Sequence, residues 1–258
     1  AGLVGVGGGI IFTPVLFAAY GSVLRVPDGI RTPLTVGTGL FCTGMAAGAS
    51  ALHHLRRGAV DGRMALGVGA ASAVAVGLVA GLVVTRPWYD ARLFQLLFAA
   101  VLLVVVGRMV RRAPPDDGAT DGNGGARWGA WLGTGTAAGT VASAVGVGGG
   151  VVLVPAYHRW FRLPMHRAVG TSSATIVLIS VLSTAAYAVL GGGVAGRPSL
   201  ALGYVDLGTG LLLAGPAVLG AQGGAALAHR IETKRLRWSF AGLAVVVAGR
   251  LVWGAVVA

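Results

Sequence analysis

The sequence predicts an all-α integral membrane protein of about eight transmembrane helices in two homologous four-helix halves. Of its 258 residues, 55% are hydrophobic and 11% are charged, and the mean hydropathy is +0.79, whereas about 25% of a typical soluble domain is charged. Apolar runs of about 20 residues, the length of a membrane-spanning helix, recur along the chain. A glycine-rich motif near the start returns in the second half, which indicates a duplication.

The glycine motif carries the evidence for this duplication. Residues 5–9 read Gly-Val-Gly-Gly-Gly and are followed by Pro14, and residues 146–150 repeat the same letters before Pro155. The offset is 141 residues for the motif (5 to 146) and again for the proline (14 to 155). Further echoes are Val-Gly-Thr at 36–38 and 169–171, and Gly-x-Val-Asp at 58–61 and 203–206.

We expect a first transmembrane repeat at residues 1–110, a linker at residues 111–127 and a second transmembrane repeat at residues 128–258. The linker contains two prolines and three aspartates and has no apolar periodicity, which is typical of a connection between folded parts. The apolar runs cover residues 1–20, 34–55, 64–84, 92–110, 128–160, 168–190, 203–228 and 236–257. Since the chain begins inside an apolar run without a methionine, we expect that residues, half a helix in length, precede it.

The run at residues 128–160 is too long for one straight span of about 20 residues. It contains the second glycine motif, so we expect a full helix over residues 128–145 followed by a broken or re-entrant piece. Four plain spans per half would give the two halves the same orientation. A re-entrant hairpin or an additional span would instead invert one half relative to the other. Both arrangements stay open at this point.

Three consecutive glycines predict a break in a helix, because each glycine costs about 1 kcal/mol relative to alanine in a helix interior. Within a membrane, irregular backbone is tolerated where it faces protein or a water-filled cavity. Helix N-termini at such a break present unpaired N–H groups and a positive dipole end, which bind anions. Interrupted helices at matching positions of two halves are typical of transporter sites. The alternative is that the glycines only allow close helix packing.

Charge and cysteine content exclude several other classes. The formal net charge is +12, but the arginines stand singly or in pairs at the ends of apolar runs, so we expect no nucleic-acid partner. Cys42 is the only cysteine, so the chain has no intrachain disulfide and no cysteine metal cluster. We expect no metal site and no cofactor. The sequence contains no H-E-x-x-H and no G-x-S-x-G motif, which predicts that the protein is not an enzyme.

With these residues in view, the chain resembles the sulfite exporter TauE/SafE family of membrane permeases. The resemblance lies in the paired Gly-x-Gly-Gly-Gly segments with their downstream prolines and in the Val-Gly-Thr opening of the next helix. It covers nearly the whole chain apart from the linker. It implies a bundle of about eight helices in the cell (inner) membrane and transport of small sulfur-containing anions such as sulfite or organosulfonates.

The expected substrate site lies between the two repeats at the glycine breaks. Backbone amides and hydroxyls can replace the hydrogen bonds that water gives to an oxyanion. The residues expected to bind substrate are Gly7, Gly8, Gly9, Thr38, Gly148, Gly149, Gly150, Thr171, Ser172 and Ser173. The alternative for the four hydroxyls is that they cap helices or bond back within their own helix.

Four further residues are candidates for proton coupling: His53, His54, Asp61 and Asp206. Histidine titrates near neutral pH, and a carboxylate within a membrane is typically functional. The alternatives are that the histidines are interfacial residues beside Arg56 and Arg57, and that the aspartates cap the helices that follow them.

The first functional hypothesis is a secondary transporter whose partners are a small anionic substrate, the lipid bilayer and other copies of the chain in a homo-oligomer. The second hypothesis comes from another class. In it, the protein is a membrane-embedded binding or partner subunit that has no transport activity of its own. Saturable ligand binding without flux would distinguish the second hypothesis from the first.

Overall fold

The structure, a computed structural model, describes residues 8–110, 128–228 and 233–257. For residues 108–110, 219–228, 233–241, 243 and 257 only the backbone is described. The elements are α1 (Gly9–Ser22), α2 (Asp28–Arg56), α3 (Gly62–Val79), η1 (Ala80–Val84), α4 (Ala91–Val110), α5 (Trp128–Val145), α6 (Gly150–Pro155), η2 (Ala156–Trp160), α7 (Met165–Leu190), β1 (Ala201–Leu202), β2 (Val205–Asp206), α8 (Leu207–Ala228) and α9 (Thr233–Val257), where η marks a π-helix.

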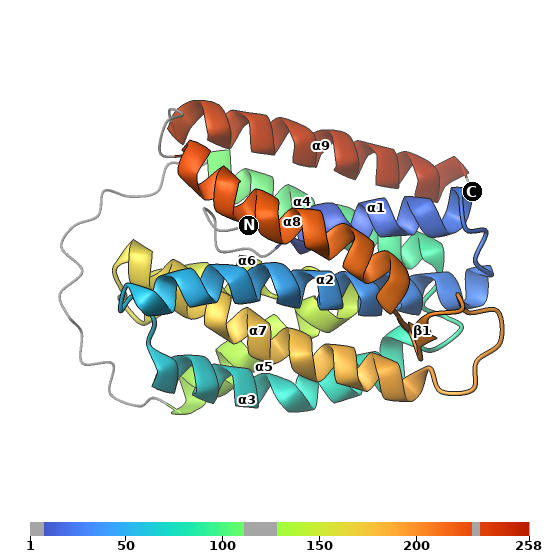
Figure 1. Cartoon of the computed structure of the whole chain (residues 1–258), viewed down its shortest axis with the longest axis horizontal. Helices are drawn as coiled ribbons and strands as arrows, with labels where there is room; N and C mark the ends of the chain where they lie inside the picture. The colour runs from blue at the N-terminus through green and yellow to red at the C-terminus, as the bar shows by residue number, and fades with distance from the viewer. Residues whose placement is uncertain (1–7, 111–127, 229–232, 258) are drawn as a thin grey trace.

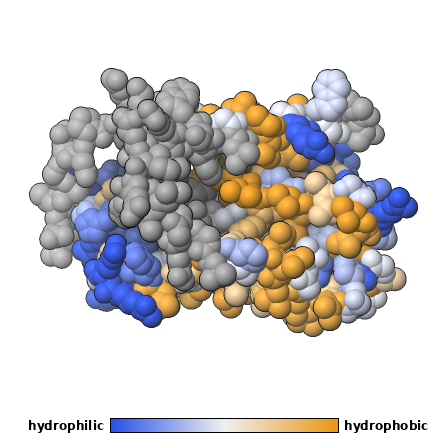
Figure 2. Space-filling model, turned by 45° about the horizontal axis from the view of Figure 1, so that its top comes forward, coloured by the Kyte–Doolittle hydropathy of each residue, from blue (hydrophilic) through white to orange (hydrophobic). Residues whose placement is uncertain are grey.

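The described part is almost entirely helical, as predicted, and the helices lie side by side along one direction (Figure 1). The exception is an antiparallel hairpin of β1 and β2 between α7 and α8. In Figure 2 apolar residues occupy the middle of the visible face and hydrophilic residues gather at its two ends, the distribution that a bilayer requires.

Within the described residues, three helices are long and apolar enough to cross a membrane, namely α2, the continuous α3–η1 unit and α7. Shorter apolar stretches occur at Gly9–Ser22, Ala91–Gly107, Leu207–Val218 and Ala244–Val256. The total of about eight spans and the division into two repeats stay predictions, and the linker at residues 111–127 lies outside the described residues.

The centre of the bundle is the antiparallel pair of α2 and α7. Gly44 of α2 faces Ser180 of α7, while further along α2 the Ser50 hydroxyl lies 3.1 Å from the Ser173 hydroxyl. The residue number therefore rises along one helix as it falls along the other. Small side chains at this interface allow the two backbones to approach closely, as in other membrane helix pairs.

The remaining helices pack across the boundary between the predicted halves. Helix α2 contacts α8 of the second half, and α7 contacts α3 of the first half. Helix α5 runs parallel to α3, because a Cβ at Gly135 would meet Ser72 N at 3.1 Å and one at Gly139 would meet Ser72 O at 2.8 Å. Helices α4 and α9 pack on each other, on the upper side of the molecule in Figure 1, and Phe94 of α4 contacts Phe17 of α1 with ring centroids 5.1 Å apart.

The second glycine motif reverses the direction of the chain inside the bundle. Gly146, Gly148 and Gly149 have φ angles of +78°, +78° and +76°, in the left-handed region where glycine is the favoured residue. Helix α6 then runs back along α5, since a Cβ at Gly149 would lie 2.7 Å from Ala138 O. The predicted helix over residues 128–145 and the break after it are thus confirmed, and the break is a tight re-entrant turn.

This turn should be intolerant of a side chain. We expect Gly149→Ala to lower the free energy of unfolding by more than about 1 kcal/mol, because alanine is strained at a positive φ and its Cβ would press on Ala138 O. Gly77→Ala is the matched control, since nothing lies within 4 Å of that Cβ position. Denaturation of both variants in detergent measures the difference. Equal stability of Gly149→Ala and Gly77→Ala would contradict the re-entrant turn.

Candidate functional site

The two glycine motifs meet in the interior of the protein. A Cβ at Gly9, the first residue of α1, would lie 2.6 Å from both Gly146 O and Val147 Cα. The Thr13 hydroxyl of α1 donates a buried hydrogen bond of 3.0 Å to Gly146 O. Segments more than 130 positions apart in the sequence are therefore in direct contact. This close approach is possible because the glycines of both motifs have no side chains.

Helices leave this meeting point in opposite directions. Figure 1 shows α1 extending toward one end of the molecule and α6 with η2 extending toward the other. Both begin at glycines of the two motifs, namely Gly9 and Gly150. The first N–H groups of a helix have no partner within it and carry a partial positive charge. At α1, a helix of 14 residues, this positive end faces the interior.

Thr43 of α2 lies between the two glycine motifs. Its Oγ1 is 2.9 Å from the position that a Cβ at Gly9 would take, and its Cγ2 is 2.6 Å from the corresponding position at Gly148. The side chain is 0% exposed, and its hydroxyl has no hydrogen-bond partner. Sequence reasoning missed this residue, because the offset that pairs Gly37 with Gly170 pairs Thr43 with Ile176.

The structure describes all but one of the glycines that we expect to bind substrate. Gly9 and Gly148 lie at the meeting point of the motifs, Gly8 directly precedes Gly9, and Gly149 and Gly150 directly follow Gly148. Gly7 lies outside the described residues. Ligand binding by these amides stays a prediction.

Two of the expected binding hydroxyls hold the predicted halves together. Thr38 Oγ1 accepts a hydrogen bond of 2.9 Å from Asp206 N, and Thr171 Oγ1 accepts one of 3.0 Å from Asp61 N. We call these bonds the two threonine latches. Each joins the Val-Gly-Thr segment of one predicted half to the Gly-x-Val-Asp segment of the other. A role of these threonines in binding substrate stays a prediction.

The aspartates of the latches also cap helices. Asp61 Oδ1 accepts a bond of 3.0 Å from Met64 N at the start of α3, and Asp206 Oδ1 accepts one of 3.2 Å from Thr209 N at the start of α8. The capping interpretation of both residues is therefore confirmed. Asp206 is nearly inaccessible, with 2% of its surface exposed.

A buried tyrosine lies near each latch, but the two tyrosines make different hydrogen bonds. The Tyr20 hydroxyl lies 3.2 Å from both Thr38 Oγ1 and Asp206 Oδ2, within hydrogen-bond distance of each. At the other latch, the Tyr157 hydroxyl instead lies 2.7 Å from the hydroxyl of Thr175. The latch at Asp206 is thus reinforced by the hydroxyl of Tyr20.

Ser172 and Ser173 follow Thr171 on α7 and are both buried. The Ser173 hydroxyl donates to Val169 O at 3.0 Å, a bond within its own helix, and also lies 3.1 Å from the hydroxyl of Ser50. Backbone bonding, one of the two interpretations of these serines, is therefore observed for Ser173. Substrate binding by Ser172 and Ser173 stays a prediction.

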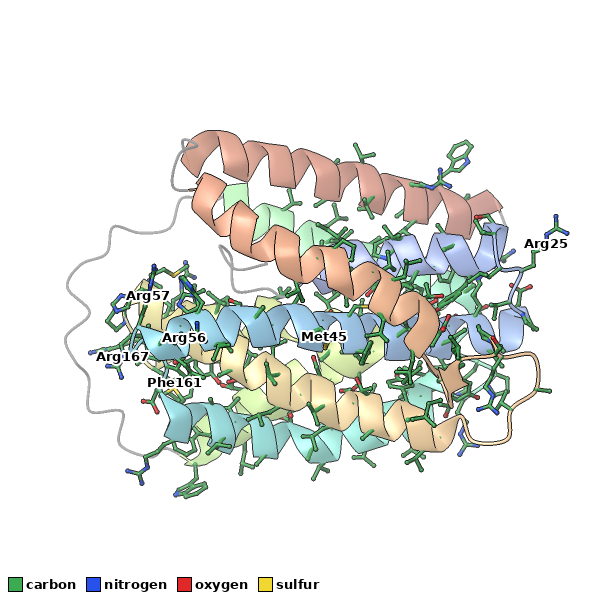
Figure 3. All side chains as sticks on the ribbon, viewed as in Figure 1. Arg25, Met45, Arg56, Arg57, Phe161 and Arg167 are labelled. Atoms are coloured by element: carbon green, nitrogen blue, oxygen red, sulfur yellow. The ribbon has the colours of Figure 1, made fainter. Side chains whose placement is uncertain are left out.

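His53 and His54 lie in the last turn of α2, with their ring centroids 5.8 Å apart. Arg56, Arg57 and Arg167 lie at the same end of the molecule (Figure 3). These positions fit the interfacial interpretation of the histidines. A role of His53, His54, Asp61 or Asp206 in proton coupling stays a prediction.

Cys42 and the acidic and histidine side chains form no metal centre in the part of the chain that the structure describes. The Cys42 thiol is buried and donates to Gly210 O at 3.4 Å.

A groove of about 360 Å³ lies elsewhere, between α4 and α9, and its lining includes Leu103, Val252 and Trp253. Apolar walls of this kind suit a lipid chain better than an anion.

The latches should contribute to stability. We expect Thr38→Val to lower the free energy of unfolding by about 1–3 kcal/mol, because the buried N–H of Asp206 would lose its acceptor. Thr136→Val is the control, since the hydroxyl of Thr136 is exposed and bonds only to carbonyls of its own helix. Chemical denaturation in detergent measures both. A Thr38→Val variant as stable as Thr136→Val would show that the latch contributes nothing.

Comparison with known proteins adds independent evidence. The sequence profile of the family "Sulfite exporter TauE/SafE" matches residues 1–251. A "probable membrane transporter protein" of Methanocaldococcus jannaschii is 25% identical over 235 residues, which cover 91% of this chain and 84% of that protein. Another of the same name from Haemophilus influenzae is 25% identical over 248 residues, which cover 96% and 91%. No solved structure matches.

The family match spans nearly the entire chain, and the described helices include several that could cross a bilayer. The two relatives are both named as membrane transporters. The chain is therefore a multi-pass membrane protein that belongs to the sulfite exporter TauE/SafE family of membrane transporters.

Proposed function

We propose that this protein is a secondary transporter of small sulfur-containing anions, such as sulfite or organosulfonates, which bind between the two repeats at the glycine breaks. Family membership supports transport and the class of substrate. The location rests on one observation, the contact of the N-terminus of α1 with the re-entrant turn at residues 146–149.

Backbone amides suit such a substrate energetically. Burial of an unpaired ion in an apolar medium is very costly, but fixed dipoles can replace its hydration shell. Positive helix ends and exposed N–H groups do so without a buried positive charge that would hold the anion too tightly. A transporter must release its substrate, so neutral donors are the better choice.

We further propose that the two repeats, residues 1–110 and 128–258, are inverted relative to each other. The antiparallel α2 and α7 and the exchanged threonine latches support this arrangement. Inverted repeats allow a transporter to open alternately to the two sides of the membrane around a fixed site. The Tyr20 hydroxyl adds hydrogen bonds to the latch at Asp206, which suits a state in which the transporter is closed at that end.

Flux measurements test the proposal. The purified full chain, reconstituted in liposomes, should carry sulfite or methanesulfonate with saturable kinetics, and empty liposomes should not. Saturable binding without flux would instead support a binding or partner subunit that has no transport activity of its own. If the protein shows neither binding nor flux of any sulfur oxyanion, the proposal is refuted.

A methyl group at the meeting point of the motifs should block transport. We expect Gly9→Ala to reduce flux more than about tenfold, the change that corresponds to 1.4 kcal/mol, because its Cβ would occupy the space between Gly146 O and Thr43 Oγ1. Gly48→Ala on α2 is the control, since nothing lies within 4 Å of its Cβ position. Size-exclusion profiles establish that both variants are folded. Unchanged flux in a folded Gly9→Ala protein would place the substrate elsewhere.

A further inference from the structure

We infer that the hydroxyls of Thr43 and Ser180 are substrate hydrogen-bond donors, and that the site they complete selects singly charged sulfonate-type anions over dianions. This inference rests on the proposed transport function and deepens it. It adds two residues that the glycine motifs do not contain, and it specifies the charge of the substrate.

The first observation is that both hydroxyls are buried without a partner. Thr43 is 0% exposed and Ser180 is 1% exposed, and neither hydroxyl oxygen has a hydrogen bond. A buried hydroxyl that makes no hydrogen bond carries a desolvation penalty that a protein ordinarily avoids. An acceptor that arrives with the substrate would remove this penalty.

The second observation is where these hydroxyls lie. Thr43 contacts both glycine motifs, with its hydroxyl toward Gly9 and its methyl group toward Gly148. Ser180 lies across the central helix pair, where its Cβ is 2.9 Å from the Cβ position of Gly44, the residue after Thr43. The positive N-terminal end of α1, which begins at Gly9, points at the same place. The Thr43 hydroxyl and the start of α1 therefore meet at the contact between the motifs, and Ser180 lies one turn along α7 from Ile176, whose Cγ2 is 3.0 Å from the Cβ position of Gly148.

The third observation is that the stretches that form this contact carry no charged side chain. The stretches that surround it in the described part of the chain contain no Lys, Arg, His, Asp or Glu: residues 9–22 of α1, 34–52 of α2, 146–157 and 168–190 of α7. The groups there that can titrate include Cys42, whose thiol donates to Gly210 O, and Tyr157, whose hydroxyl lies 2.7 Å from the hydroxyl of Thr175. The hydroxyl donors assigned to the substrate are therefore neutral, and the buried carboxylate of Asp206 is held apart from them by Thr38 and Tyr20.

Charge selectivity follows from this neutral lining. The cost of transferring an ion from water into a medium of low dielectric constant rises with the square of its charge. The stabilisation that dipoles and hydroxyls give to an ion rises only linearly with its charge. They therefore offset the transfer cost of a monoanion far more completely than that of a dianion. A sulfonate or hydrogen sulfite ion therefore fits this site, and sulfate or fully ionised sulfite does not.

Flux in proteoliposomes tests the charge selectivity. Methanesulfonate, a monoanion, should be carried at least about tenfold faster than sulfate, a dianion of similar size. Sulfite flux should rise on acidification through neutral pH more steeply than methanesulfonate flux, because hydrogen sulfite replaces the dianion while methanesulfonate keeps its single charge. Sulfate flux equal to that of methanesulfonate would overturn the selectivity but leave the transport function standing. Absence of flux for every sulfur oxyanion would refute the transport function itself.

Variants test the two hydroxyls. Thr43→Val keeps the shape of the side chain and removes the donor, so it should raise the KM for methanesulfonate by about tenfold, while Thr43→Ser should stay near wild type. Ser180→Ala should raise KM in the same direction. Thr32→Val is the matched control, because Thr32 is an equally buried threonine of α2 whose hydroxyl also has no partner but which lies outside the meeting point. A KM for Thr43→Val equal to that of Thr32→Val would overturn the assignment.

Discussion

The structure depends on a chain reversal inside the bundle, made possible by three glycines with left-handed backbone angles. Gly146, Gly148 and Gly149 turn the chain from α5 into α6 within a short distance. Residues with side chains would be strained in these conformations, and their Cβ atoms would press on Thr13 at Gly146, on Thr43 at Gly148 and on Ala138 of α5 at Gly149. The reversal brings the start of α1 against the turn, and every feature of the proposed site follows from that contact.

The second constraint is the exchange of contacts between the predicted halves. Thr38 and Thr171 each bond to the backbone of an aspartate that lies far away in the sequence, and each of those aspartates caps the next helix. These neutral bonds anchor the loops of one half on the central helix of the other. Such contacts can be broken and remade at moderate cost, which agrees with the proposed movement of two inverted repeats relative to each other.

Much of this arrangement can be predicted from residue types. Helix α5 begins and ends where the length of the apolar run and the position of the glycine motif predict, because glycine is unfavourable in a helix and a bilayer fixes the span. The capping by Asp61 and Asp206 is equally predictable. By contrast, Thr43 has no counterpart at the matching position of the second half, which is Ile176. Its place between the motifs depends on how α2 packs on the re-entrant turn, and packing between distant segments cannot be read from local sequence.

The central claim is that an anion binds where Gly9, Thr43 and Gly148 meet. The most direct measurement is an experimental structure with bound selenite, a heavier analogue of sulfite, in which anomalous scattering locates the selenium. The account predicts a selenium peak within hydrogen-bond distance of the Thr43 hydroxyl and of the amides at the start of α1. A peak found only at the basic end of the molecule, beside Arg56 and Arg57 (Figure 3), would contradict it.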